Sequence, residues 1–179
     1  MKTSILLLIL IFCLSCSEKK IDKKSNYDQP NYSFNNILSY GKEDTIFIKS
    51  RFQDCGEWGG HEELVKIYRS ERKPKLTYVK FKVDCGIRNS LGQIIQTKKF
   101  TQHILLSNSQ QLVLMKYMND LMKFQFLKEE ISHSGNSFYL SNTKGDLKIS
   151  HYGDQSLPLN SYNTLMTALK LPKVNIENR

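Results

Sequence analysis

The sequence predicts one α+β domain: an antiparallel β-meander of about four strands plus a second hairpin, with two helices packed on one sheet face. From about residue 44 to residue 106, apolar and polar side chains alternate with the two-residue period of a strand. Two later segments repeat apolar residues at helical spacing instead. The 179 residues are 40% hydrophobic and 24% charged, which is typical of a globular protein and excludes a wholly disordered chain.

Four strands are predicted first, over residues 44–53, 63–70, 76–84 and 94–106. Short polar connections join them, as expected for antiparallel neighbours. The residues expected to face the core are Ile46, Ile48, Phe52, Val65, Ile67, Val79, Phe81, Val83, Phe100, Ile104 and Leu106. In the third strand this alternation places Tyr78, Lys80 and Lys82 on the outer face.

The period then changes to that of a helix, expected over about 108–127. It begins with a capping box between Ser107 and Gln110. A second hairpin follows around the polar turn 142–145, and a last helix spans about 160–170. The apolar helix residues expected in the core are Leu114, Met118, Leu121, Met122, Tyr162, Leu165, Met166 and Leu169. His133 and His151 have no partners at ligand spacing and are expected on the surface.

The N-terminus has the architecture of a secretory signal over residues 1–15, with Lys2 before an apolar run. Leu14-Ser15-Cys16 resembles the lipobox of bacterial lipoproteins, although Cys13 stands where that family usually has leucine. The resemblance implies cleavage before Cys16, acylation of Cys16 (palmitate among the chains) and anchoring to a bacterial membrane. The protein would then face the periplasm or the cell surface. The alternatives are a buried N-terminal strand or an uncleaved anchor.

Residues 16–36 are polar, lack apolar periodicity and are expected to form a flexible tether behind the acylated cysteine. Residues 37–179 would form the globular domain. The chain has 26 Lys and Arg against 17 Asp and Glu, a formal charge of +9. This excess favours anionic partners.

Cys55 and Cys85 stand in matching Asp-Cys-Gly tripeptides on either side of a predicted hairpin. In an exported protein they are expected to form a disulfide. The alternatives are a metal site made of Cys55, Cys85 and His61, or two free thiols. We predict no metal and no cofactor, because neither a CxxC pair nor an HExxH motif is present.

The glycine-rich segment 54–63 is the first candidate binding loop. Its candidate residues, together with one residue that the disulfide would bring close, are Asp54, Glu57, Trp58, His61, Glu62 and Asp84. Carboxylates beside a histidine can bind a cation or perform general acid–base catalysis. The alternative is a purely structural turn pinned by the disulfide.

The outer face of the sheet is the second candidate. Its expected cations are Lys49, Arg51, Lys66, Lys80, Lys82 and Lys99, interleaved with Phe47, Tyr68, Tyr78 and His103. In an exported protein such a face suits an anionic envelope ligand or an acidic protein partner rather than nucleic acid. A solvated face in which lysine stems cover the sheet is the alternative.

No P-loop, dinucleotide-binding or nucleophile-elbow motif is present in the sequence. The best hypothesis is therefore a membrane-anchored, non-enzymatic binding or interaction module of the cell envelope. The alternatives are a small inhibitor or immunity-type lipoprotein and an envelope hydrolase that uses the loop from Asp54 to His61.

Overall fold

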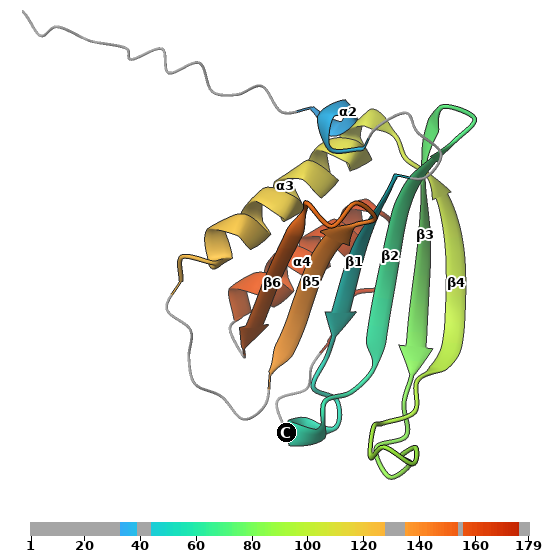
Figure 1. Ribbon diagram of the computed structural model, residues 1–179, viewed down its shortest axis with the longest axis vertical. Coiled ribbons are helices and arrows are strands. Elements are labelled where there is room, and N and C mark those ends of the chain that lie inside the picture. The colour runs from blue at the N-terminus through green and yellow to red at the C-terminus, as the bar shows by residue number, and fades with distance from the viewer. Residues whose placement is uncertain (1–32, 39–43, 128–134, 154–155, 176–179) are drawn as a thin grey trace, which may run out of the picture. The chain divides into compact units, whose positions relative to one another are not determined.

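The computed structural model describes residues 33–38, 44–127, 135–153 and 156–175. Its centre is a six-stranded antiparallel sheet with the order β4-β3-β2-β1-β5-β6 (Figure 1). The strands are β1 (Thr45–Arg51), β2 (Glu62–Ser70), β3 (Lys73–Lys82), β4 (Thr97–Leu105), β5 (Asn136–Asn142) and β6 (Lys148–Gly153). The helical elements are α2 (Phe34–Ile37), the 3₁₀ turn η1 (Gly56–Trp58), α3 (Asn108–Phe124) and α4 (Ser156–Ala168).

The predicted α+β class is confirmed, and the two predicted strand groups form one sheet. β1 to β4 form the meander, and the hairpin of β5 and β6 joins it because β5 pairs with β1. In that register Ile48 lies opposite Leu140. The sequence predicts the hairpin but not its position beside the first strand.

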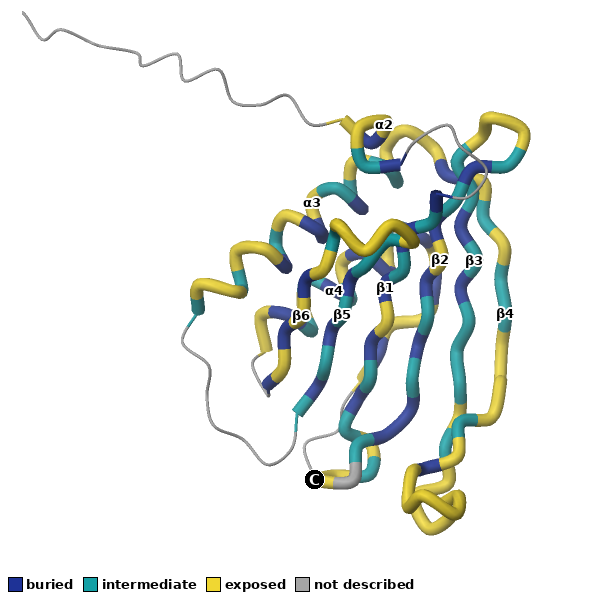
Figure 2. Tube along the Cα trace, in the orientation of Figure 1, coloured by how far each residue is buried: buried dark blue, intermediate teal, exposed yellow. Residues whose placement is uncertain are grey.

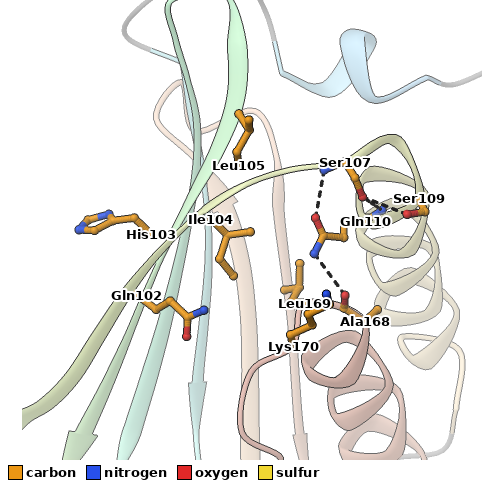
Figure 3. A pocket seen from close by; sticks show the side chains of 10 residues that line it. All are labelled: Gln102, His103, Ile104, Leu105, Ser107, Ser109, Gln110, Ala168, Leu169 and Lys170. Carbon is orange, nitrogen blue, oxygen red and sulfur yellow. Dashed lines mark hydrogen bonds between the residues drawn. The ribbon is translucent and has the colours of Figure 1, made fainter.

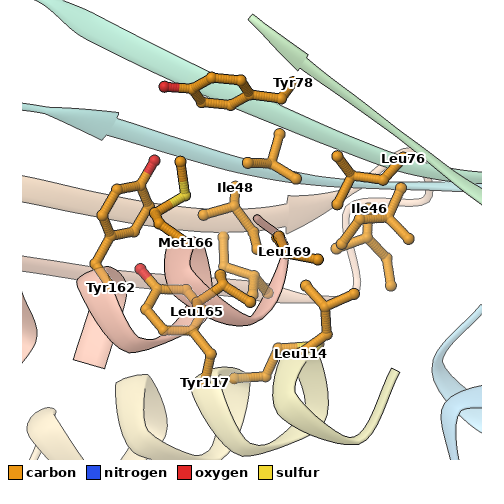
Figure 4. Close-up of a cluster of buried hydrophobic side chains, with 14 of the residues drawn as sticks. Ile46, Ile48, Leu76, Tyr78, Leu114, Tyr117, Tyr162, Leu165, Met166 and Leu169 are labelled. Atoms are coloured by element: carbon orange, nitrogen blue, oxygen red, sulfur yellow. The ribbon is translucent and has the colours of Figure 1, made fainter. Parts of the chain in front are cut away.

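Helices α3 and α4 cover one face of the sheet (Figure 1). Apolar side chains from the strands meet Leu114 and Tyr117 of α3 and Tyr162, Leu165 and Met166 of α4 (Figure 4). No described helix covers the opposite face, which we call the open face (Figure 1). The two faces therefore have different environments, and every strand must present the correct side chains to each.

The predicted alternation along β3 is wrong by one residue. Leu76 and Tyr78 are fully buried on the helix side, so Val79 and Phe81 lie on the open face and are half-buried there. Apolar residues occupy both faces of β3, so the pattern alone does not select one. Pairing with β2 decides the orientation, because Tyr78 lies opposite the core residue Val65.

Helix α3 starts where the sequence predicts it, with both bonds of the capping box present between Ser107 and Gln110. The predicted stripe of α4 is also buried. Three further expectations about single residues are wrong. Phe100 on β4, expected in the core, is 41% exposed. Met122 is 47% exposed, near the end of α3, and His151 is buried at 4% exposure with its ring against Phe124. His133 lies outside the described residues.

The short helix α2 belongs to the packed domain, although the sequence assigns most of it to the tether. Phe34 is part of the core, and the buried Arg69 on β2 donates to the carbonyl oxygen of Leu38 and to the side chain of Asn35. Residues 1–32, including the predicted signal segment and Cys16, lie outside the described part of the chain. None of the described helices is long and apolar enough to cross a membrane.

Candidate functional site

A buried carboxylate lies at one end of the sheet, on the face that the helices cover. Glu63, near the start of β2, has a fully buried side chain. Its cross-strand neighbour Lys80 places Nζ 2.8 Å from Glu63 Oε1, and the hydroxyl of Tyr162 on α4 donates to Oε2 at 2.7 Å. The carboxylate therefore links two strands and a helix.

His61 precedes β2 and joins this carboxylate to the glycine-rich loop. Its Nε2 lies 3.3 Å from Glu63 Oε1, and its Nδ1 contacts Asp54 Oδ2. The backbone N–H of His61 also donates to Asp54 Oδ2, at 3.0 Å. The ring packs against Phe52 with 4.9 Å between centroids. We call Asp54, His61, Glu63, Lys80 and Tyr162 the polar cluster.

The contacts within the polar cluster shift the pKa values of Asp54, His61 and Glu63. Burial disfavours the charged forms of all three acid–base groups, but hydrogen bonds outweigh this effect. Bonds to Asp54 and Glu63 raise the pKa of His61, while bonds from His61 lower the pKa of Asp54. Bonds from His61, Lys80 and Tyr162 lower the pKa of Glu63. The two carboxylates thus favour the imidazolium form of His61 more than water favours it in an ordinary histidine.

This geometry does not resemble a catalytic dyad. A general base needs a ring nitrogen within reach of the substrate proton, whereas both nitrogens of His61 face carboxylates of the protein itself. The His61 side chain is only 11% exposed, and it lines neither of the two pockets described below. The arrangement is suited to holding the loop against the sheet end.

Cys55 and Cys85 form a disulfide with an S–S distance of 2.03 Å, as predicted. The pairing consumes both thiols, so the alternative metal site with His61 and the alternative of free thiols are excluded for this structure. Across the described ranges, no group of three or more His, Cys, Asp or Glu side chains is arranged to hold a metal ion. The disulfide ties the loop to the segment that follows β3.

Of the five predicted loop residues whose side chains the structure describes, Asp54 and His61 are the two that it brings together. Glu62 points to the open face and pairs with Lys49 at 3.0 Å. Glu57 is exposed in η1, and the exposed Asp84 accepts a hydrogen bond from the backbone of Gly86. The side chain of Trp58 lies outside the described parts.

Sequence reasoning missed Glu63, Lys80 and Tyr162 as members of the polar cluster. The signal for Glu63 is its position two residues before Val65, on the same predicted face as Val65 and Ile67. A carboxylate in that position must find partners in the core. No such local signal identifies Lys80, because its orientation depends on the register of β3.

Two pockets lined by described residues lie at different places on the domain. One, of about 290 Å³, lies beside η1 and is lined by Arg51, Glu57, Tyr152 and nearby glycines. A Cβ on Gly59 would lie 2.3 Å from the guanidinium of Arg51, so the absence of a side chain there lets Arg51 pack on the loop. The other pocket, of about 590 Å³, lies between β4 and the ends of the two long helices (Figure 3).

The predicted basic face is present only in part. Lys49, Arg51 and Lys66 lie on the open face, as do Phe47, Tyr68 and His103. Lys80 and Tyr78 point to the helix side instead, because the orientation of β3 differs from the predicted one. Lys82 follows the alternation of Lys80 but is exposed at the sheet end, and Lys99 is the exposed extra residue of a β-bulge.

The register adds further cations to the open face that the sequence did not identify as part of it. They are Lys73, Lys75, Lys98 and Lys148, which lie opposite Ser70, Tyr68, Phe81 and Ser141 in neighbouring strands. The chain matches no protein-family model and no functionally curated protein. The function of the protein is therefore inferred from the chemistry of the open face, the polar cluster and the pockets.

Proposed function

We propose that this protein is a lipid-anchored, non-enzymatic interaction module of the bacterial cell envelope, and that its open face docks an acidic protein. The anchor would be the acylated Cys16, as the resemblance of Leu14-Ser15-Cys16 to a lipobox implies. Several acyl chains hold a protein firmly at a membrane. The domain would then meet its partner close to that membrane.

The observation that carries the docking proposal is the charge imbalance of the open face. Its cations are Lys49, Arg51, Lys66, Lys73, Lys75, Lys98 and Lys148. Among the described strand residues, Glu62 is the one carboxylate on this face, and it is already paired with Lys49. Such a surface attracts an acidic protein over a distance and speeds its association.

Aromatic side chains between the cations support a protein partner. In neighbouring strands Phe47 lies opposite Lys66, Lys49 lies opposite Tyr139, and Tyr68 lies opposite Lys75. These three rings are half-buried, so part of each remains available to a partner. Aromatic residues and arginine are enriched at protein interfaces and supply much of their binding energy.

Charge reversal tests the docking surface. Lys66 and Lys148 are exposed and lie on either side of Phe47 in one cross-strand row. We expect the K66E/K148E variant to bind polyglutamate at least about tenfold more weakly than the unaltered protein in a fluorescence titration. The matched control is K123E/K173E, which makes the same change of net charge at exposed positions outside the sheet.

The control and a second probe decide the outcome. Equal weakening by both double variants would mean that polyglutamate senses only the overall charge, which would contradict a defined docking face. Vesicles containing phosphatidylglycerol serve as the second probe. If they bind through Lys66 and Lys148 while polyglutamate does not, the face is a membrane surface and the acidic-protein proposal fails.

A further inference from the structure

Strand β4 is an edge of the sheet that no other described element pairs with. It is hydrogen-bonded to β3 on one side and ends the strand order on the other (Figure 1). An exposed edge presents unpaired backbone N–H and C=O groups and can accept a further strand. β4 is nine residues long.

The outward-facing backbone groups of β4 can be identified. The N–H of Leu106 donates to the carbonyl oxygen of Pro74 at 3.0 Å, so Leu106 bonds toward β3. Backbone groups alternate in direction along an antiparallel strand. Ile104 therefore also bonds toward β3, while the N–H and C=O groups of His103 and Leu105 point to the outer edge.

The two halves of β4 differ in how well they are protected against pairing with another strand. The first half carries Lys98 and Lys99 and a bulge where the register with β3 shifts. Lysines and bulges are the usual means of preventing edge-to-edge pairing. The second half, Gln102–Leu105, has neither feature, and all four of its residues line the 590 Å³ pocket.

This pocket lies on the helix side of the edge. The side chains of Gln102 and Ile104 point toward the helices and that of His103 points away (Figure 3). The opposite wall is made of Gln110 at the start of α3 and Lys170 after α4. In a strand added beside β4, alternate side chains would enter the pocket, where Lys170 offers a cation to a carboxylate.

We propose that the second half of β4 binds an extended, acidic segment of a partner protein by strand addition, with alternate side chains of that segment in the pocket. The acidic character rests on the proposed function and on the strand itself, because β4 contains two lysines and no carboxylate. A second copy of this chain fits less well, since both edges would carry the same lysines.

A proline substitution on β4 tests strand addition at its outer edge without removing a backbone hydrogen bond between β3 and β4. His103→Pro removes an N–H that faces outward, and proline is tolerated at such edge positions. The matched control is His103→Ala, which loses the same side chain, including its 3.0 Å contact with Thr77, but keeps the N–H. The probe is a fluorescent synthetic peptide as long as β4 that alternates valine with glutamate.

We expect His103→Pro to weaken binding of this peptide about tenfold relative to His103→Ala, at unchanged thermal stability. Equal affinities of the two variants would overturn strand addition. If His103→Pro does not fold, Leu105→Pro and Leu105→Ala replace the pair, because Leu105 also faces the outer edge.

Hydrogen exchange of the unaltered protein gives an independent readout. The peptide should slow exchange at the amides of His103 and Leu105, while the already bonded amide of Ile104 changes little. If the peptide is bound and these two amides still exchange as fast as in the free protein, the proposal is refuted. Loss of peptide binding in K66E/K148E but not in His103→Pro would leave the open-face proposal standing and reject the edge. Loss of peptide binding in His103→Pro but not in K66E/K148E would leave the edge proposal standing and reject the open-face proposal.

Discussion

Glu63 is a fully buried carboxylate whose charge is compensated by three side chains from different parts of the chain. A buried charge is costly unless it is paired and hydrogen-bonded. Here Lys80 supplies the cation, Tyr162 a neutral donor and His61 a link to the loop. The burial of Glu63 therefore couples the loop, the sheet and α4 in one folded arrangement.

The pKa of His61 predicts how stability depends on pH. Because the folded-state pKa is raised above 6.5, the contribution of His61 is complete below pH 6.5 and is lost as the pH rises through the raised value. Urea unfolding of the unaltered protein should therefore give a falling free energy of unfolding above pH 6.5. His61→Gln should flatten this fall, whereas an unchanged slope would show that His61 does not titrate as inferred.

At low pH, protonation of Asp54 and Glu63 removes the stabilisation that the polar cluster provides. Their lowered pKa values mean that their contributions are present above the ordinary values, 3.8 and 4.5, and are lost as the pH falls through the lowered ones. The polar cluster should thus stabilise the protein most between about pH 4.5 and the raised pKa of His61. The other three histidines, His103, His133 and His151, are present in both the unaltered protein and the His61→Gln variant, so the difference between the two pH profiles isolates His61.

Lys80 provides a direct test of the orientation of β3. Lys80→Met would remove the lysine that pairs with the buried Glu63 at 2.8 Å, and we expect a loss of about 2–4 kcal/mol in the free energy of unfolding. Lys66→Met, at an exposed open-face position on the neighbouring strand, should change it by less than about 0.5 kcal/mol. Chemical denaturation measures both. Similar small losses would mean that Lys80 points outward.

At the scale of elements, the glycine-rich loop is fixed from two sides. The polar cluster holds Asp54 and His61 to the sheet, and the disulfide ties Cys55 to Cys85 after β3. Gly60 contributes through close approach, because a Cβ there would lie 2.2 Å from the carbonyl oxygen of Phe52. These restraints make the loop a rigid end to the sheet and position η1 beside Arg51.

Removing the disulfide should show how much it contributes to the free energy of unfolding. The two cysteines are 30 residues apart, so the chain-entropy estimate for the cross-link is about 3.6 kcal/mol. We expect the C55A/C85A variant to lose about 3–4 kcal/mol in urea unfolding, and the unaltered protein to lose a similar amount on reduction. A loss under about 1 kcal/mol would indicate that the polar cluster holds the loop without the disulfide.

At the scale of the whole molecule, the domain is asymmetric. One face of the sheet is covered by α3 and α4 (Figure 2) and contains the core, and the strand registers place cations and aromatic rings on the open face. The edge at β4 adjoins this open face, since His103 points toward it. The two proposed contacts could therefore engage one partner.

Intact mass of the protein from its native membrane tests the predicted anchor. A mass that corresponds to cleavage before Cys16 and three acyl chains is expected, with two thiols appearing only after reduction. The matched variant Cys16→Ser should stay uncleaved and unacylated. An unaltered protein that still begins at Met1 would refute the lipoprotein prediction and the envelope location proposed with it.

Local signals predicted the elements well and the site poorly. The capping box at Ser107 and the stripe through Tyr162 and Leu165 are confirmed because each depends on residues within a few positions. The polar cluster joins residues up to 99 positions apart, Glu63 and Tyr162, so no local pattern could show it. His151 was expected on the surface for the same reason: its neighbour Phe124 is distant in the sequence.

The sequence by itself determined the α+β class, the start of α3, the second hairpin and the pairing of Cys55 with Cys85. Periodicity, capping and cysteine spacing are local signals in the sequence. They predict these features regardless of which other parts of the chain pack against them. Only the tertiary structure decided which face of β3 is buried, where β5 joins the sheet and which cations share the open face. Strand register fixes all three, and it depends on contacts between residues far apart in the chain.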